Sequence, residues 1–144
     1  MDETKNLSPR DLPSGEEAIN KEIDLDRLLR EEREPRTVLM VFANNPRTLQ
    51  FTLEESLTLG RRSEAGDQPD IDLAPFGAYP AGISRVHVRL LRQGSQVYVE
   101  DLGSRNGTFV EDLRLSPGEI LPVMDGQAVR LGGLQGWIFY KNIK

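Results

Sequence analysis

Three short polar stretches of the sequence contain the side chains that could do chemistry. They are Gly60-Arg61-Arg62, Ile83-Ser84-Arg85-Val86-His87, and residues 101–108 with the sequence DLGSRNGT. Arginine presents a planar fork of donors that matches phosphate oxygens, and a serine hydroxyl and amides beside glycine add further donors. An asparagine side chain has two donors and one acceptor, which suits holding the main chain of an extended peptide. The set therefore predicts binding of a phosphate dianion.

The same residues do not form a catalytic set. His87 is the only histidine, and the absence of cysteine excludes disulfides, zinc–thiolate sites and a thiol nucleophile. The sequence shows no nucleophile with an adjacent base, no P-loop and no metal-ligand spacing. We therefore expect no catalytic residue, no metal and no cofactor. Asp70 and Asp72 are interpreted as solvated or structural carboxylates, and Asp101 is expected to order its own loop.

These stretches fall where short β-strands are predicted to end. Strand signals recur about every 8–12 residues after residue 35, separated by Gly, Asn, Asp or Pro, which predicts an all-β sandwich or barrel. The loops of such a fold gather at its ends, where they can build one site. Residues 63–82 form the longest irregular stretch, and a loop of that length is expected to be functional or disordered. Asn106-Gly107 is also typical of a hairpin turn.

The order of the three motifs resembles that of the forkhead-associated (FHA) domain. The family's Gly-Arg, Ser-x-x-His and Ser-x-Asn-Gly-Thr patterns stand here at residues 60–61, 84–87 and 104–108, and the resemblance covers about residues 37–142. It implies a β-sandwich of about eleven strands that binds phosphothreonine peptides in signalling. The loop of residues 66–82 is longer than in minimal members and is similar to that of bacterial FHA proteins.

The resemblance also implies roles for individual residues. Phosphopeptide contacts are expected from Arg61, Ser84, Arg85, Arg105 and Asn106. Structural support of the site is expected from Gly60, His87 and Gly107, the glycines by permitting tight backbone geometry. The implied partners are proteins that contain phosphothreonine, such as substrates of a Ser/Thr kinase.

Charge and composition divide the chain into two predicted parts, residues 1–35 and residues 36–144. The first part holds eleven acidic and six basic residues, and the second holds twelve of each. The absence of net positive charge argues against nucleic-acid binding, which needs many clustered Lys and Arg, although it allows a local basic pocket for one phosphate. No apolar run approaches the roughly 18–20 residues that span a membrane, and the N-terminus lacks the apolar core of a signal peptide. We therefore expect a cytoplasmic protein.

The charged N-terminal extension offers two further hypotheses. We expect it to be disordered and then helical over about residues 15–33, with Ser14 and Glu17 forming a capping box. One alternative to phosphopeptide binding is a phosphate-independent scaffold that uses this helix and a sheet face. The other hypothesis is that the acidic tail folds back over the basic pocket, with Thr4 as an intramolecular phosphorylation site.

Overall fold

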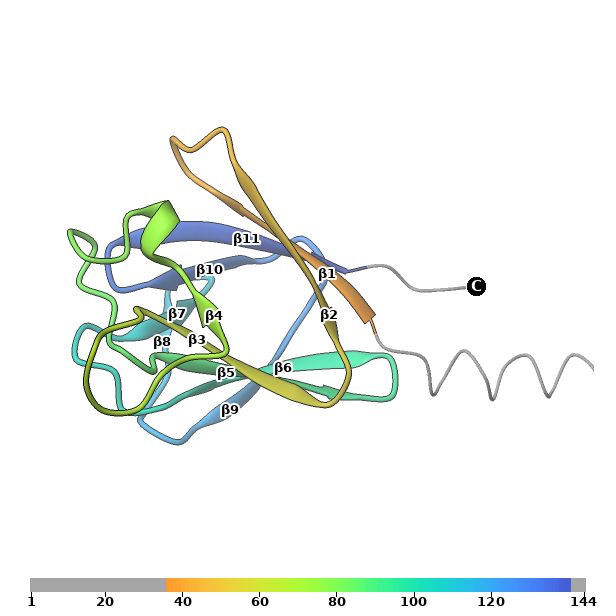
Figure 1. Ribbon diagram of the computed structural model, residues 1–144. Coiled ribbons are helices and arrows are strands. Elements are labelled where there is room, and N and C mark those ends of the chain that lie inside the picture. Colours follow the sequence, from red (N-terminus) through yellow and green to blue (C-terminus); the bar gives the residue numbers. More distant parts are fainter. Residues whose placement is uncertain (1–35, 141–144) are drawn as a thin grey trace, which may run out of the picture. The chain divides into compact units, whose positions relative to one another are not determined.

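The computed structural model describes residues 36–140, shown in colour in Figure 1. The predicted helix over residues 15–33, the possible phosphorylation site Thr4 and the proposed fold-back of the tail all lie outside the described residues. The boundary between an extension and a domain at residues 35 and 36 accordingly stays a prediction.

The described residues form an all-β sandwich with eleven strands and one 3₁₀ turn, so the fold class and strand number expected from the sequence are confirmed. The elements are β1 (Arg36–Phe42), β2 (Thr48–Leu53), β3 (Ser56–Gly60), β4 (Ile71–Asp72), η1 (Ala74–Phe76), β5 (Val88–Gln93), β6 (Gln96–Asp101), β7 (Thr108–Val110), β8 (Leu113–Arg114), β9 (Ile120–Val123), β10 (Ala128–Leu131) and β11 (Leu134–Tyr140).

The strands divide between two sheets. One has the order β2-β1-β11-β10-β7-β8 and the other has the order β4-β3-β5-β6-β9. All neighbouring strands are antiparallel except β3 and β4, which pair in parallel. Because β6 and β7 belong to different sheets, the Asn106-Gly107 pair between them crosses the sandwich and does not form the hairpin turn that its sequence suggested.

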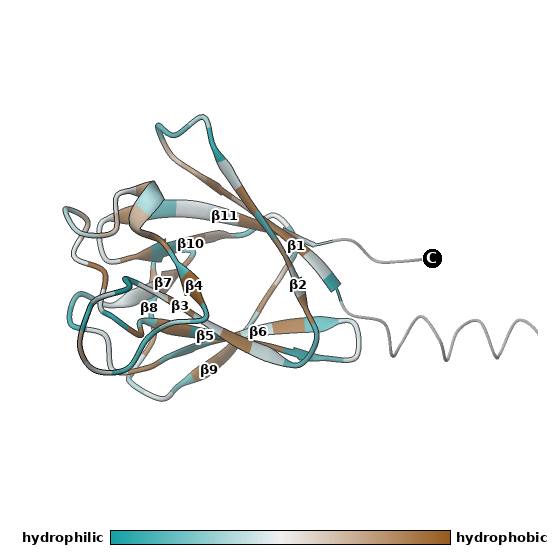
Figure 2. Ribbon diagram, viewed as in Figure 1, coloured by the Kyte–Doolittle hydropathy of each residue, from teal (hydrophilic) through white to brown (hydrophobic). Residues whose placement is uncertain are grey.

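The core lies between the two sheets and follows from alternation along the strands. In β1, Val38, Met40 and Phe42 are buried while the residues between them are partly exposed, as expected for a strand with one face inward. Figure 2 shows this alternation as hydrophobic segments interrupted by polar ones along the strands. The buried side chains from both sheets form one continuous apolar cluster, which fixes the strand ends and the loops that leave them.

The long irregular stretch of residues 63–82 is more ordered than its sequence suggested. It contains β4 and η1, and its residues Leu73, Phe76 and Ala78 are buried in the core. The Phe76 ring packs 4.8 Å from the Phe42 ring, measured between centroids. Isolated apolar residues in a polar stretch gave too weak a periodic signal to predict this packing.

Asp70 and Asp72 brace the same stretch, as the structural interpretation of these carboxylates predicted. Asp70 accepts a 2.8 Å hydrogen bond from the Thr58 amide, and Asp72 accepts hydrogen bonds of 3.0 Å from the amides of Arg62 and Ala74.

Within residues 36–140, no helix has the length and apolar character needed to cross a membrane.

Candidate functional site

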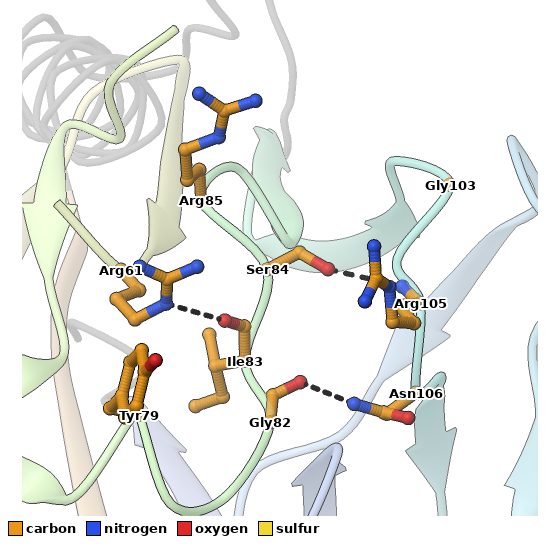
Figure 3. Close-up of a pocket in the computed structure, with 9 residues that line it drawn as sticks. All are labelled: Arg61, Tyr79, Gly82, Ile83, Ser84, Arg85, Gly103, Arg105 and Asn106. Carbon is orange, nitrogen blue, oxygen red and sulfur yellow. Dashed lines mark hydrogen bonds between the residues drawn. The ribbon is translucent and has the colours of Figure 1, made fainter. Parts of the chain in front are cut away.

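Three loops gather at one end of the sandwich, on the left in Figure 1, where they leave β3, lead into β5, and connect β6 to β7. They surround an open cavity of about 380 Å³. Its lining consists of Arg61, Tyr79, Gly82, Ile83, Ser84, Arg85, Gly103, Arg105 and Asn106. All five residues that the sequence predicted to contact a phosphopeptide therefore line a single cavity, as Figure 3 shows.

Arg61 is positioned by main-chain contacts at the end of β3. Its amide donates to the carbonyls of Ser84 at 3.0 Å and Arg85 at 3.1 Å. A β-carbon at Gly60 would collide with the Arg85 carbonyl and would lie 2.9 Å from the Ser84 oxygen, so only glycine allows this approach. The Gly-Arg pair thus brings the β3 end against the segment that carries the serine.

The Arg61 guanidinium is oriented before any ligand arrives. Its Nε donates to the Ile83 carbonyl at 3.1 Å, and its Cζ lies 5.2 Å from the centroid of the Tyr79 ring. Among the described residues, the two terminal nitrogens of this guanidinium have no hydrogen-bond partner. A guanidinium that is held at Nε and has both terminal nitrogens available suits an anion that presents two oxygens.

Ser84 connects two of the loops. Its Oγ accepts a 3.0 Å hydrogen bond from the Arg105 amide, which leaves the hydroxyl hydrogen free to donate into the cavity. Its own amide donates to Nδ1 of His87 at 3.1 Å. The bond from Arg105 joins the loop before β5 to the loop before β7, and the bond to His87 holds the Ser84 main chain within its own loop.

His87 lies fully buried beneath these loops. Because Nδ1 accepts from the Ser84 amide, Nε2 carries the proton and donates to the Gly107 carbonyl at 2.9 Å. Burial lowers the pKa of His87 below its usual 6.5, and this effect outweighs the Gly107 carbonyl and the Asp101 charge, which both raise it. The ring is therefore neutral near pH 7 and braces two loops at once.

Asp101 orders the loop that carries Arg105 and Asn106. One carboxylate oxygen accepts from the hydroxyls of Ser104 at 2.6 Å and Thr108 at 2.7 Å, and the other accepts from the amides of Gly103 and Ser104. Burial raises the pKa of Asp101, but these hydrogen bonds together outweigh burial and lower it. The carboxylate is charged and internal to its loop, as the sequence predicted.

Asn106 spans from the same loop to the segment before Ser84. Its Nδ2 donates to the Gly82 carbonyl at 2.8 Å, which leaves one N–H and the side-chain oxygen for a ligand. Gly82 and Gly107 have φ values of +75° and +91°, a region that favours glycine. The Gly107 carbonyl meets His87 and also accepts from the Gly132 amide at 2.9 Å.

Two arginines of the motifs behave differently from Arg61. Arg85 lines the cavity, but its NH1 donates to the Ala65 carbonyl at 2.6 Å, and in Figure 3 its guanidinium points away from Arg61 and Arg105. Arg62, which follows Arg61 directly in the first motif, is exposed and does not line the cavity. Within residues 36–140, no group of three or more metal-ligating side chains gathers.

Tyr79 is the main lining residue that the sequence did not single out. The residue is 77% exposed, more than any other large hydrophobic residue among those described, and it borders the cavity beside Arg61. The distance from the Arg61 guanidinium to the ring is in the range of a cation–π contact. The only signal for it was its position in the long loop, because a lone tyrosine has no pattern.

Fold and site together define a class of protein: a two-layer β-sandwich with a preformed, arginine-bearing pocket on the loops at one end. Comparison with known proteins places the chain within that class. The FHA domain family matches residues 57–132, which is more than half of the sequence. The chain therefore belongs to the FHA domain family.

Individual relatives agree with this assignment. Protein FraH from Nostoc sp. is 34% identical over 85 residues, which is 58% of this chain and 29% of FraH. The FHA domain-containing protein FhaB from Mycolicibacterium smegmatis is 34% identical over 90 residues, which is 58% of this chain and 55% of FhaB. The chain thus covers less than two thirds of the length of either relative.

A solved structure from a study of phosphothreonine-dependent FHA domain interactions has the same fold. It matches with a TM-score of 0.56 and 24% sequence identity, over 74% of this chain and 99% of that one.

Proposed function

We propose that this protein is an interaction module that binds phosphothreonine-containing segments of partner proteins at the loop cavity. The partners would be phosphorylated by a separate Ser/Thr kinase, and the protein itself would act by binding and not by catalysis. Membership of the FHA domain family supports this proposal, as does the phosphothreonine dependence of the interactions studied for the structural neighbour.

One observation carries the proposal: the guanidinium of Arg61, the hydroxyl of Ser84 and the side-chain amide of Asn106 line the same cavity, and each keeps hydrogen-bonding groups that are free for a ligand. Arg61 would bind two phosphate oxygens through its terminal nitrogens, and Ser84 would donate its hydroxyl to another. Charge-assisted hydrogen bonds are stronger than neutral ones, and Arg61 and Ser84 are already held in place by contacts within the protein. Asn106 would hold the peptide main chain beside the phosphothreonine with its remaining donor and acceptor.

The other two arginines would contribute to a lesser degree. The main-chain amide of Arg105 already donates to the Ser84 hydroxyl. The Arg105 guanidinium therefore starts close to Ser84 and can reach a phosphate bound to that hydroxyl. Arg85 would have to leave the Ala65 carbonyl before it could turn towards the phosphate. Gly60, His87 and Gly107 would act indirectly, by keeping the loops together.

The test is a titration of the full chain with a degenerate phosphothreonine peptide library, followed by fluorescence anisotropy. The same library with phosphoserine and with unphosphorylated threonine provides the ligand controls. The Arg61→Ala variant should bind phosphothreonine peptides about ten- to a hundredfold more weakly, the effect of losing a charge-assisted contact. Arg47→Ala is the matched protein control, because Arg47 lies in the β1–β2 turn and does not line the cavity.

Equal binding by wild type and Arg61→Ala would show that the assigned site is wrong. Binding should also weaken as the pH falls through about 6, because the phosphate then loses its second charge.

A further inference from the structure

A row of three side chains crosses the outer face of the six-stranded sheet. Arg130 on β10 and Arg114 on β8 both pair directly with Phe109 on β7, one from each side. Thr108 and Val110 on either side of Phe109 are buried, so alternation directs Phe109 outward. The guanidinium carbons of Arg130 and Arg114 lie 3.8 Å and 5.6 Å from the centroid of the Phe109 ring.

These two cations are not neutralised within the part of the chain that the structure describes. Neither Arg114 nor Arg130 has a carboxylate within ion-pair distance there. Arg130 donates to the Gly132 carbonyl at 2.7 Å, and Glu111 in the β7–β8 turn accepts instead from the Ala128 amide. Stacking on one ring restrains both guanidiniums without satisfying their charge, so an anion can approach them without breaking an ion pair.

The row adjoins the loop cavity on the side of Asn106. A β-carbon built on Gly107 would lie 2.9 Å from Nε of Arg114 and 3.0 Å from a ring carbon of Phe109. Since Gly107 follows Asn106 directly, Nε of Arg114 lies within about 8 Å of the Asn106 Cα. An extended peptide advances about 3.3 Å per residue, so two to four residues bridge this distance.

We propose that Arg114 and Arg130 form a second subsite that recognises an anionic side chain of the bound peptide, two to four residues from the phosphothreonine on the Asn106 side. The ligand group is a carboxylate or a second phosphate, since both present oxygens that match a guanidinium. Arg114 is the principal contact because it lies against Gly107, and Phe109 contacts both cations from its position between their strands. This inference rests on the proposed function of the cavity.

The experiment uses the full chain and a set of phosphothreonine peptides that differ at one position. Alanine, glutamate, phosphoserine or lysine is placed in turn at each of the four positions on either side of the phosphothreonine. Wild type should bind the best glutamate or phosphoserine peptide about three- to tenfold more tightly than its alanine counterpart, as expected for partly exposed charge pairs. In the double variant Arg114→Gln, Arg130→Gln this preference should disappear, while affinity for the alanine peptide stays within about twofold.

Two further variants keep the test independent of folding defects. Arg47→Gln removes an exposed charge outside the cavity lining, and it should retain the preference. Arg114→Glu should reverse the preference at the same peptide position, so that lysine binds more tightly than glutamate.

The outcomes separate the two proposals. If wild type binds no phosphothreonine peptide, the proposed function fails and this inference fails with it. If wild type binds phosphothreonine peptides but shows no anionic preference, or if the double variant keeps that preference, only the second subsite is refuted. The comparison of glutamate with phosphoserine shows which of the two anionic groups the subsite binds more tightly.

Discussion

Lowering the pH from 6.5 to 5.0 should destabilise the protein through His87. The buried ring accepts from the Ser84 amide at Nδ1 and donates to the Gly107 carbonyl at Nε2. Protonation would place a second N–H against the Ser84 amide, and burial disfavours the charge, so the folded-state pKa lies below 6.5. In the unfolded chain the ring titrates near 6.5. The unfolded state therefore binds more protons, and stability falls as the pH drops below about 6.5 until it reaches the folded-state pKa.

The size of the effect has an upper limit set by one proton. A single group contributes at most about 1.4 kcal/mol per pH unit, so the loss between pH 6.5 and 5.0 is at most about 2 kcal/mol. His87 is the only histidine, and the hydrogen bonds around Asp101 and Asp72 lower the pKa of each carboxyl, so their titration falls at lower pH. Comparison with a variant that lacks the imidazole therefore assigns the pH dependence between 5.0 and 6.5 to this one ring.

Urea unfolding of the full chain at several pH values measures this effect, with the single tryptophan, Trp137 on β11, as the fluorescent probe. No peptide is added, because its phosphate would titrate in the same range. The His87→Gln variant, which cannot titrate, should lack the slope even if it is less stable throughout. A free energy of unfolding that stays constant from pH 6.5 to 5.0, or an imidazole pKa above 6.5 by NMR, would refute the reasoning.

Three substitutions test other parts of the site. Gly60→Ala should cost about 2 kcal/mol or more in thermal unfolding, because its methyl group would collide with the Arg85 carbonyl; an unchanged melting temperature would contradict the close approach described for β3. Asp101→Asn should cost about 1–3 kcal/mol in urea unfolding, because the Asn oxygen can keep only the amides of Gly103 and Ser104, while its N–H₂ would face two hydroxyls that now donate to a charged oxygen; a neutral result would mean that the loop does not depend on the charge. Tyr79→Ala should weaken phosphopeptide binding about two- to fivefold by calorimetry through loss of the contact with Arg61, whereas Tyr79→Phe should bind like wild type; equal effects of both would assign the role to the hydroxyl instead of the ring.

Local residue patterns predicted the fold, and the resemblance of three motifs to the FHA domain implied which residues form the site. Alternation of apolar residues marked most strands, and the three motifs stood at the strand ends that the fold brings together. The all-β sandwich of about eleven strands is confirmed, and Arg61, Ser84 and Asn106 do line one cavity. Their roles in binding a phosphopeptide stay predictions.

Other features depended on contacts between residues far apart in the chain. The two-residue strands β4 and β8 are too short to show alternation, and the burial of Phe76 follows from packing against Phe42 on β1. The direction of Arg85 is set by the carbonyl of Ala65, twenty residues away. No residue pattern within a short window encodes such a contact. The sequence therefore indicated that Arg85 belongs to the site, but not that its guanidinium binds the Ala65 carbonyl.

Because the segment between β6 and β7 crosses from one sheet to the other, the two sides of the cavity should tolerate substitutions to different degrees. The segment with Arg105 and Asn106 also joins the two sheets, and its hydrogen bonds to Asp101, Ser84 and Gly82 mean that many substitutions there would loosen the whole sandwich. Tyr79 stands on the opposite wall (Figure 3) and is mostly exposed to solvent, so we expect its exchange to cost the fold little. Paralogues that select different partners would therefore diverge first at the position of Tyr79.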